Sequence, residues 1–251
     1  MKFHSIALAA LAAVAAPAFA TVQTGGTIGQ AEYVFIATNA AGSYFQDLGT
    51  STDAVAALMN STGSFSQSVA GTEWNKFLAF GGTGTTWAII AAQPLDVGFN
   101  PGEINAWTTR NVNQPLGTIQ NSQSNDGTNN LATWFLQADN AANPKVADNR
   151  QAAAFGTPTY FDNGVTSFNG FFNARNTVGT AAQMVYLTPS SDTSDAPSQY
   201  NVLANSVGNA YTANFDGTNV TITAAVPEPS SYAMLAAGLA AVGFMVRRRK
   251  A

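Results

Sequence analysis

Two apolar segments, one at each end of the chain, confine the part that can fold in water to the residues between them. The first, "MKFHSIALAALAAVAAPAFA", has a basic start, an apolar run and a small-x-small finish at Ala20. This order is typical of a secretory signal peptide, so we expect signal peptidase to cleave after Ala20. The mature chain then begins at Thr21, outside the cytoplasm.

The second apolar segment, Tyr232 to Val246, holds no charged side chain, and with Ser230 and Ser231 it comprises 17 residues. A helix of that length spans about 25 Å, near the lower limit for crossing a bilayer. Four cations follow it directly: Arg247, Arg248, Arg249 and Lys250. Because cations stay on the cytoplasmic side, we predict one transmembrane helix with this basic stop inside. A buried core helix is the alternative, but it gives the four cations no evident purpose.

A short proline-flanked acid precedes the second apolar segment. Pro227 and Pro229 remove two backbone donors and hold the chain extended around Glu228. A stop-transfer anchor alone does not need such a motif. An extended, exposed peptide just outside the membrane is what a processing enzyme can bind.

These three features together resemble the PEP-CTERM sorting signal of Gram-negative bacteria. The resemblance covers the last 26 residues, from Val226 to Ala251. It implies processing by an exosortase, a membrane-embedded enzyme similar to cysteine transpeptidases. It also implies transient anchoring in the inner membrane, then a place in the cell envelope, at the cell surface or outside the cell. Proteins of this kind are tied to exopolysaccharide production and biofilm, but the tail carries no information on the activity of the domain before it.

We therefore divide the chain into a signal peptide (1–20), an exported β-rich domain (21–226) and a sorting signal (227–251). The exported domain holds five of the ten cations and 13 of the 14 acids, so its net charge is near −8. A basic groove for nucleic acid is absent, which makes nucleic acid an unexpected partner.

The exported domain lacks the residues that much enzyme chemistry requires. The sole histidine, His4, lies in the signal peptide, and the chain has no cysteine. Catalytic Ser-His-Asp and Cys-His pairs, histidine-bound or thiolate-bound metals and haem are therefore excluded. Disulfides are excluded too, so stability must come from a hydrophobic core. We expect no catalytic residue, no metal and no cofactor.

Carboxylates and calcium remain possible sources of chemistry. Most acids stand beside or near glycine, asparagine, serine or threonine, as in Asp47-Leu48-Gly49, Asp126-Gly127 and Asp216-Gly217. Such neighbours favour turns in which the acid caps backbone donors. The stretches Gln120–Asn130 and Tyr160–Gly164 hold oxygen ligands suited to calcium but lack the spacing of a calcium-binding loop. We interpret both stretches as solvated loops.

Runs of aromatic and β-branched residues predict a mainly β domain, a sandwich or a meander sheet, with two or three inserted helices. The predicted strands are 32–38, 85–92, 104–110 and 182–188, with a hairpin whose turn is Asp216-Gly217. The predicted helices are 53–60, 72–80 and 131–138, the last two with aromatic stripes that favour core packing over a sugar site. Residues 188–199 are predicted to form an exposed, mobile loop.

Three functions fit these observations. The first is an envelope or extracellular-matrix protein that acts by association. The second is a polysaccharide-binding module, which exposed coplanar aromatics would distinguish. The third is a secreted carboxylate-based hydrolase, which needs two acids in one cleft.

Overall fold

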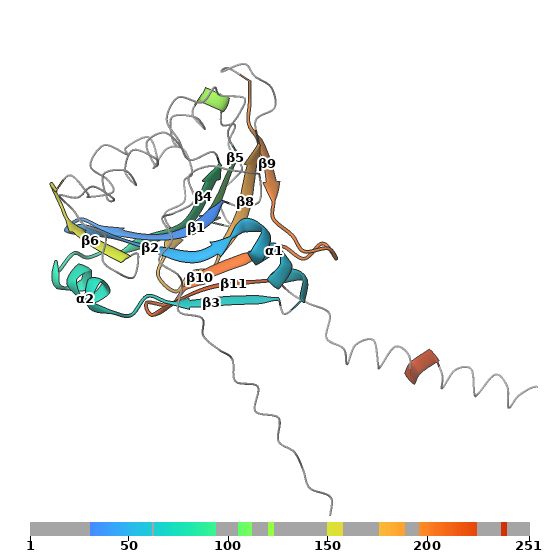
Figure 1. Ribbon diagram of the computed structural model, residues 1–251, viewed down its shortest axis with the longest axis horizontal. Helices are drawn as coiled ribbons and strands as arrows, with labels where there is room; N and C mark the ends of the chain where they lie inside the picture. The colour runs from blue at the N-terminus through green and yellow to red at the C-terminus, as the bar shows by residue number, and fades with distance from the viewer. Residues whose placement is uncertain are drawn as a thin grey trace, which may run out of the picture.

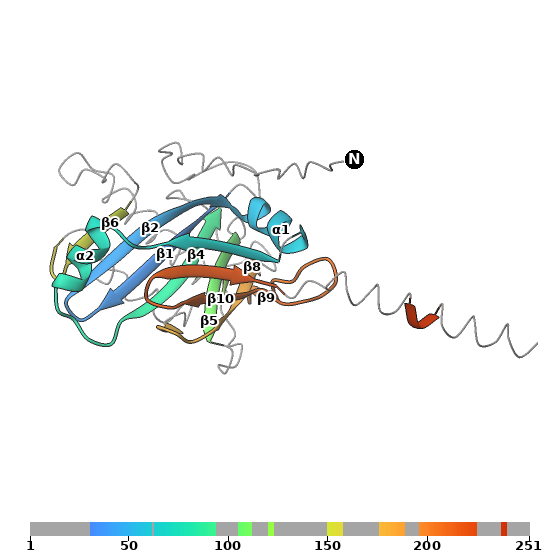
Figure 2. The same cartoon turned by 90° about the horizontal axis from the view of Figure 1, so that it is seen from below.

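Alternating inward and outward side chains build one antiparallel sheet that curls around an aromatic core (Figure 1). The computed structural model describes residues 31–61, 63–93, 105–111, 120–122, 150–157, 176–188, 196–224 and 237–239. The strands are β1 (Glu32–Asn39), β2 (Gly42–Ser51), β3 (Ser64–Ser68), β4 (Thr86–Gln93), β5 (Asn105–Asn111), β6 (Arg150–Ala154), β7 (Asn176–Thr177), β8 (Ala182–Thr188), β9 (Gln199–Val202), β10 (Thr212–Phe215) and β11 (Asn219–Thr223). Two helices, α1 (Thr52–Ser61) and α2 (Thr72–Ala79), lie at opposite ends of the sheet (Figure 2).

The strand order is β3-β11-β10-β8-β5-β4-β1-β2-β6, with β7 beside β4 and β9 beside β8. Every pairing is antiparallel. The described strands thus form one sheet rather than the two packed sheets of a sandwich. The meander is also wrong, because β2 and β3 follow each other in the chain but lie far apart in the strand order. Helix α1 carries the chain between them, so the sheet can curl.

The β1–β2 hairpin shows why its turn residues are needed. The Asn39 side-chain oxygen accepts hydrogen bonds from the backbone N–H groups of Ala41, at 2.9 Å, and Gly42, at 3.0 Å. A Cβ atom at Gly42 would lie 2.7 Å from the carbonyl oxygen of Ala153 on β6. Only glycine therefore lets β6 pair closely with β2 at this point.

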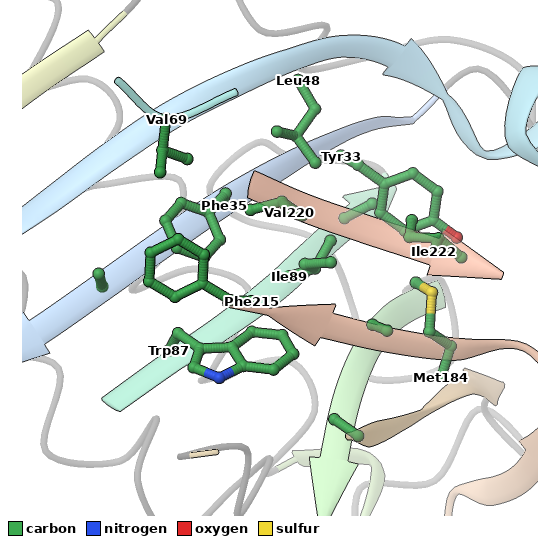
Figure 3. Packing of buried hydrophobic residues seen from close by; sticks show 14 of the residues in the cluster. Tyr33, Phe35, Leu48, Val69, Trp87, Ile89, Met184, Phe215, Val220 and Ile222 are labelled. Carbon is green, nitrogen blue, oxygen red and sulfur yellow. The ribbon is translucent and has the colours of Figure 1, made fainter. Parts of the chain in front are cut away.

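The core fills the inner face of the curled sheet. Phe215 on β10 lies at the centre, with ring centroids 4.8 Å from Phe35 and 5.5 Å from Trp74. Trp74 also contacts Phe77 on the same helix and Tyr44 on β2, at 5.1 and 5.0 Å between centroids. Figure 3 shows Phe35, Trp87 and Phe215 meeting between facing strands. Rings from four strands and a helix thus pack into one cluster.

Both predicted helices inside the described residues are confirmed. In α1, Val55 and Met59 are buried one turn apart, and the Ser51 side-chain oxygen accepts a hydrogen bond from the Ala54 N–H at 3.2 Å. In α2, Trp74 and Phe77 are buried as expected for core packing, but Leu78 is 54% exposed. The apolar stripe predicted on α2 is therefore wrong for Leu78, because the helix contacts the sheet with a narrower face.

Most predicted strands are confirmed as β1, β4, β5 and β8, and the predicted hairpin is β10–β11. Ala88, Ile89 and Ile90 are all buried, so both faces of β4 are covered at these positions. The strands β2, β3, β6, β7 and β9 were not predicted. The expected exposed loop is wrong at its C-terminal end, since Ser198 is buried and Gln199 begins β9. The 131–138 helix lies outside the described residues.

The two ends of the strand order meet at the segment that follows β3. The Gln46 side chain on β2 donates a hydrogen bond to the Ser68 carbonyl oxygen at 3.0 Å. The Arg150 guanidinium on β6 donates to the carbonyl oxygens of Ser68 and Ala70, each at 3.2 Å. These bonds connect the segment Ser68–Ala70 to the far end of the sheet.

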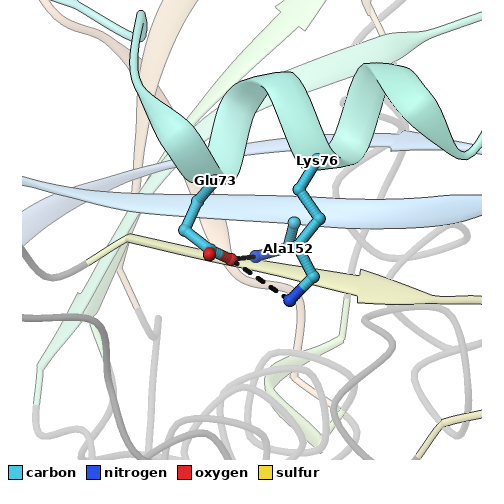
Figure 4. Close-up of polar contacts among 3 residues, drawn as sticks. All are labelled: Glu73, Lys76 and Ala152. Atoms are coloured by element: carbon cyan, nitrogen blue, oxygen red, sulfur yellow. Dashed lines mark hydrogen bonds and ion pairs between the residues drawn. The ribbon is translucent and has the colours of Figure 1, made fainter.

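Helix α2 protects the outer edge of β6, the last strand in the order. Glu73 accepts a hydrogen bond from the Ala152 backbone N–H at 2.9 Å, and Lys76 lies 3.6 Å from the same carboxylate (Figure 4). An edge N–H that would otherwise invite another strand is thereby occupied. Of the two contacts, the backbone bond contributes more, because the Lys76 side chain is 55% exposed and its ion pair is screened by water.

We predict that Phe215→Ala destabilises the domain by about 3–5 kcal/mol, because it removes the central ring of the cluster and leaves a cavity. The matched control is Phe155→Ala, whose ring is 68% exposed and which should cost less than about 0.5 kcal/mol. Urea unfolding of the purified proteins measures both. Equal losses for the two variants would contradict the central position of Phe215.

We predict that Glu73→Ala destabilises the domain by about 1–3 kcal/mol, because it leaves the Ala152 N–H without its acceptor. Glu73→Gln keeps an acceptor oxygen and should cost less. Lys76→Ala should cost at most about 1 kcal/mol, since it removes only a screened ion pair. Chemical denaturation of the three variants measures the free energy of unfolding of each and so gives the order of the losses. A Lys76→Ala loss as large as that of Glu73→Ala would show that the ion pair, not the backbone bond, dominates.

Candidate functional site: the sorting tail and the end of the folded domain

The residues predicted to direct sorting all lie outside the described residues. They are the cleavage position Ala20, the motif Pro227, Glu228 and Pro229, and the basic stop Arg247, Arg248, Arg249 and Lys250. In the predicted transmembrane segment only residues 237–239 are described, and they are helical. Within the described ranges, no helix is long and apolar enough to cross a membrane. The structure therefore describes where the folded domain ends rather than the motif itself.

That end is held firmly to the sheet and to the region after α1. Strand β11 pairs with β10 on one side and with β3 on the other. Ala224, the residue after β11, is buried and donates its backbone N–H to the Gly63 carbonyl oxygen at 2.9 Å. At the other end of α1, Thr52 donates its N–H to the carbonyl oxygen of Ala31 at 2.9 Å. The described domain thus starts and finishes beside α1.

Asp47 and Asp216 accept hydrogen bonds from backbone N–H groups, as the glycines near them predicted. Asp216 accepts hydrogen bonds from the N–H groups of Asn219 and Thr218, both at 2.7 Å. These bonds, first the one from Asn219, hold the pKa of Asp216 below its usual value. A lowered pKa in the folded state stabilises the hairpin at neutral pH, and this contribution is lost as the pH falls through that pKa. Asp47 likewise accepts from the Gly49 N–H at 2.7 Å, where Gly49 has a φ of 60°.

Little can be placed of the two stretches that hold oxygen ligands suited to calcium and that we interpreted as solvated loops. Of Gln120–Asn130, residues 120–122 are described, and there the buried Asn121 accepts a hydrogen bond from the Ser198 hydroxyl at 2.9 Å. Asp126-Gly127 and Tyr160–Gly164 lie outside the described ranges. Among the residues that the structure describes, no group of three His, Cys, Asp or Glu side chains could hold a metal ion.

One aromatic pair in the core cluster lies on β5 and β8, the Trp107 ring being part of the cluster and Tyr186 packing against it. The rings of Trp107 on β5 and Tyr186 on β8 stack with centroids 4.7 Å apart and planes 27° apart. The Tyr186 hydroxyl donates to the Asn105 side-chain oxygen at 3.0 Å, and burial raises the pKa of Tyr186. Because Trp107 is only 5% exposed, its ring faces are not available as a sugar platform.

A polar surface that we did not predict covers the outer face of three strands. Its members, called here the hydroxyl face, are Ser64, Ser66 and Ser68 on β3, Thr212 and Asn214 on β10, and Asn219, Thr221 and Thr223 on β11. The register aligns them in cross-strand rows such as Ser66–Thr221–Asn214. None is charged. The sequence signal for the hydroxyl face was the alternation of Ser, Thr or Asn with other residues in "SFSQS" and "NVTIT". In the second stretch the alternating residues are Val220 and Ile222.

Comparison with known proteins identifies the tail. A family model described as the PEP-CTERM protein-sorting motif matches residues 225–250, a range that begins directly after Ala224. No curated protein and no solved structure gives a significant match to the chain. The resemblance seen in the sequence is thus confirmed. Residues 225–250 form a PEP-CTERM protein-sorting motif, which indicates a protein that an exosortase sorts to the cell envelope or surface.

Proposed function

We propose that this protein is an exported envelope or extracellular-matrix protein that acts by association rather than catalysis. The observation that carries the export and envelope part of the proposal is the sorting motif at residues 225–250. Signal peptidase would remove residues 1–20, the tail would anchor the chain briefly in the inner membrane, and exosortase would then process it. Exopolysaccharide in the biofilm matrix is the environment in which such a protein would work.

The division between tail and domain rests on the last bonds of the sheet. Ala224 is buried and hydrogen-bonded, whereas the motif begins three residues later with Pro227. A proline-rich extended peptide cannot continue the β11 ladder, because Pro227 and Pro229 have no N–H to donate. We therefore infer that residues 21–226 are the functional domain and that residues 227–251 are the sorting signal.

A non-catalytic role is supported by the chemistry available to the domain. After removal of the signal peptide the chain has neither histidine nor cysteine. Glu73, Asp47 and Asp216 each bind backbone N–H groups, so their carboxylates already have structural roles. The hydrolase alternative would have to draw on other acids. Eight of the 13 acids in the exported domain lie outside the described residues.

Binding of a polysaccharide is the second candidate, and the hydroxyl face favours it. Serine and threonine hydroxyls both donate and accept hydrogen bonds, and asparagine amides do so through separate atoms. A grid of such groups without charge suits a neutral, polyhydroxylated chain. The buried Trp107 argues against binding by aromatic stacking. Binding of neutral glycans that weakens when Ser66 and Thr221 are replaced by lysine would distinguish this candidate from a purely structural protein.

We predict that processing shortens the protein by roughly the last 25 residues. Mass spectrometry of envelope and medium fractions measures the C-terminus in the wild type and in a strain without exosortase. Replacing Pro227, Glu228 and Pro229 by alanine should block the cut, because the extended, rigid peptide is lost. The matched control is the double change of Ser230 and Ser231 to alanine, which should leave processing unchanged.

The contradicting result is a full-length C-terminus in the wild type that does not change when exosortase is deleted. The tail would then be a plain membrane anchor, and the sorting function would be withdrawn.

A further inference from the structure

The distance between the folded domain and the sorting motif is short. Only Ala225 and Val226 separate the buried Ala224 from Pro227. Even a fully extended chain covers about 10 Å over these three steps. Tyr232, where the apolar segment starts, is eight residues beyond Ala224 and at most about 28 Å away. An enzyme that binds the motif must therefore approach the surface around Ala224 closely.

That surface is formed by the end of α1 and by a tight loop between β9 and β10. The Ser206 N–H donates to the Asn60 side-chain oxygen at 2.7 Å, which ties the loop to the helix. Asn205 closes the loop: its side-chain oxygen accepts from the N–H groups of Val207, at 3.2 Å, and Asn209, at 2.9 Å. Figure 2 shows this loop at the α1 end of the molecule. We call Asn60, Ser61 and Ala204–Ala210 the rim.

The rim, like the hydroxyl face, lacks charged side chains, and it adds an exposed valine. None of its residues is charged, although the exported domain carries a net charge near −8. Val207 at the tip of the loop is 56% exposed, and Ser61, Ser206 and Gly208 are also exposed. The bonds from Asn205 and Asn60 hold this apolar tip in one position. A fixed, uncharged surface with an exposed valine suits burial against another protein, since no charge has to be desolvated.

We propose that the rim is the surface against which the exosortase docks when it binds the sorting motif. The proposal rests on the proposed function, because it assumes that this enzyme processes the tail. Because the extended chain from Ala224 to Pro227 covers only about 10 Å, an enzyme that binds the motif lies at the rim. The contact is favourable because the rim is uncharged. Docking there would position Pro227–Pro229 for cleavage while the domain stays folded.

The test is Val207→Glu in the full-length protein, with Leu78→Glu as the matched control. Both side chains are exposed to a similar degree, 56% and 54%, but Leu78 is on α2 at the opposite end of the sheet. Pulse-chase labelling in a strain with exosortase gives the rate of tail removal. Val207→Glu should slow it about tenfold, because an unpaired carboxylate would be buried against the enzyme. Leu78→Glu should stay within about twofold of the wild type.

Two further variants keep the test decisive. Ser206→Glu places the same charge elsewhere on the rim and should slow processing similarly, should Val207→Glu fail to fold. Inserting six glycine and serine residues between Ala225 and Val226 adds up to about 20 Å of reach. Because the enzyme can then bind the motif without contacting the domain, this insertion should restore processing of Val207→Glu to within about twofold of the wild type.

The outcomes separate this proposal from the sorting function. Exosortase-dependent processing at equal rates in the wild type and both rim variants would overturn the docking surface alone. So would equal slowing by Leu78→Glu, or a Val207→Glu protein that leaves the membrane more easily but is processed normally, which would assign the rim to lipid. A wild type that exosortase does not process would overturn both proposals.

Discussion

The hydrogen bonds to the segment Ser68–Ala70 bring the two ends of the sheet together, and the rest of the fold depends on this closure. Gln46 and Arg150 donate to its carbonyl oxygens from β2 and β6. The curl brings Phe215 on β10 against Phe35 on β1 and Trp74 on α2. Without disulfides, the domain is held by this packing and by the bonds that close it.

The same closure explains how the sheet protects its edges. At one end of the order, Glu73 occupies an outward N–H of β6. At the other end, β3 lies at the edge with Ser64, Ser66 and Ser68 facing outward, and Ser68 is bound from across the sheet. Edge strands are otherwise free to pair with other chains.

Strands whose apolar and polar residues alternate could be predicted from the sequence. Strands that lack this alternation could not. Val220 and Ile222 alternate with polar residues after a clear turn, so β10–β11 was evident. The β2 sequence places Gln46 and Asp47 among buried positions, which obscures the alternation. The alanines in the β6 sequence "RQAAA" favour a helix. Pairing with β2 and the hydrogen bond that the Ala152 N–H donates to Glu73 nevertheless hold this segment extended. In both cases tertiary contacts override local preference.

The tail was predictable for a different reason. Its information lies in order and composition rather than in contacts, so Pro227, Glu228, Pro229 and the final cations can be read directly, and the matched motif at 225–250 agrees. The rim could not be found this way, because the neutrality of Ala204–Ala210 has meaning only once the loop is known to lie beside Asn60 and Ala224. Surfaces of this kind arise from residues that are distant in the sequence, so sequence patterns do not reveal them.

We infer that the fold of the exported domain is complete before the sorting signal (227–251) begins. The most direct test is thermal unfolding of the fragment Thr21–Val226, monitored by circular dichroism. The full-length protein in detergent is measured for comparison. The account predicts one cooperative transition for the fragment, with a β-rich spectrum and a midpoint within a few degrees of the full-length value, because Ala224 already makes the last bond of the sheet. A fragment that is unfolded, or that melts without cooperativity, would show that the tail is part of the fold and would contradict the account.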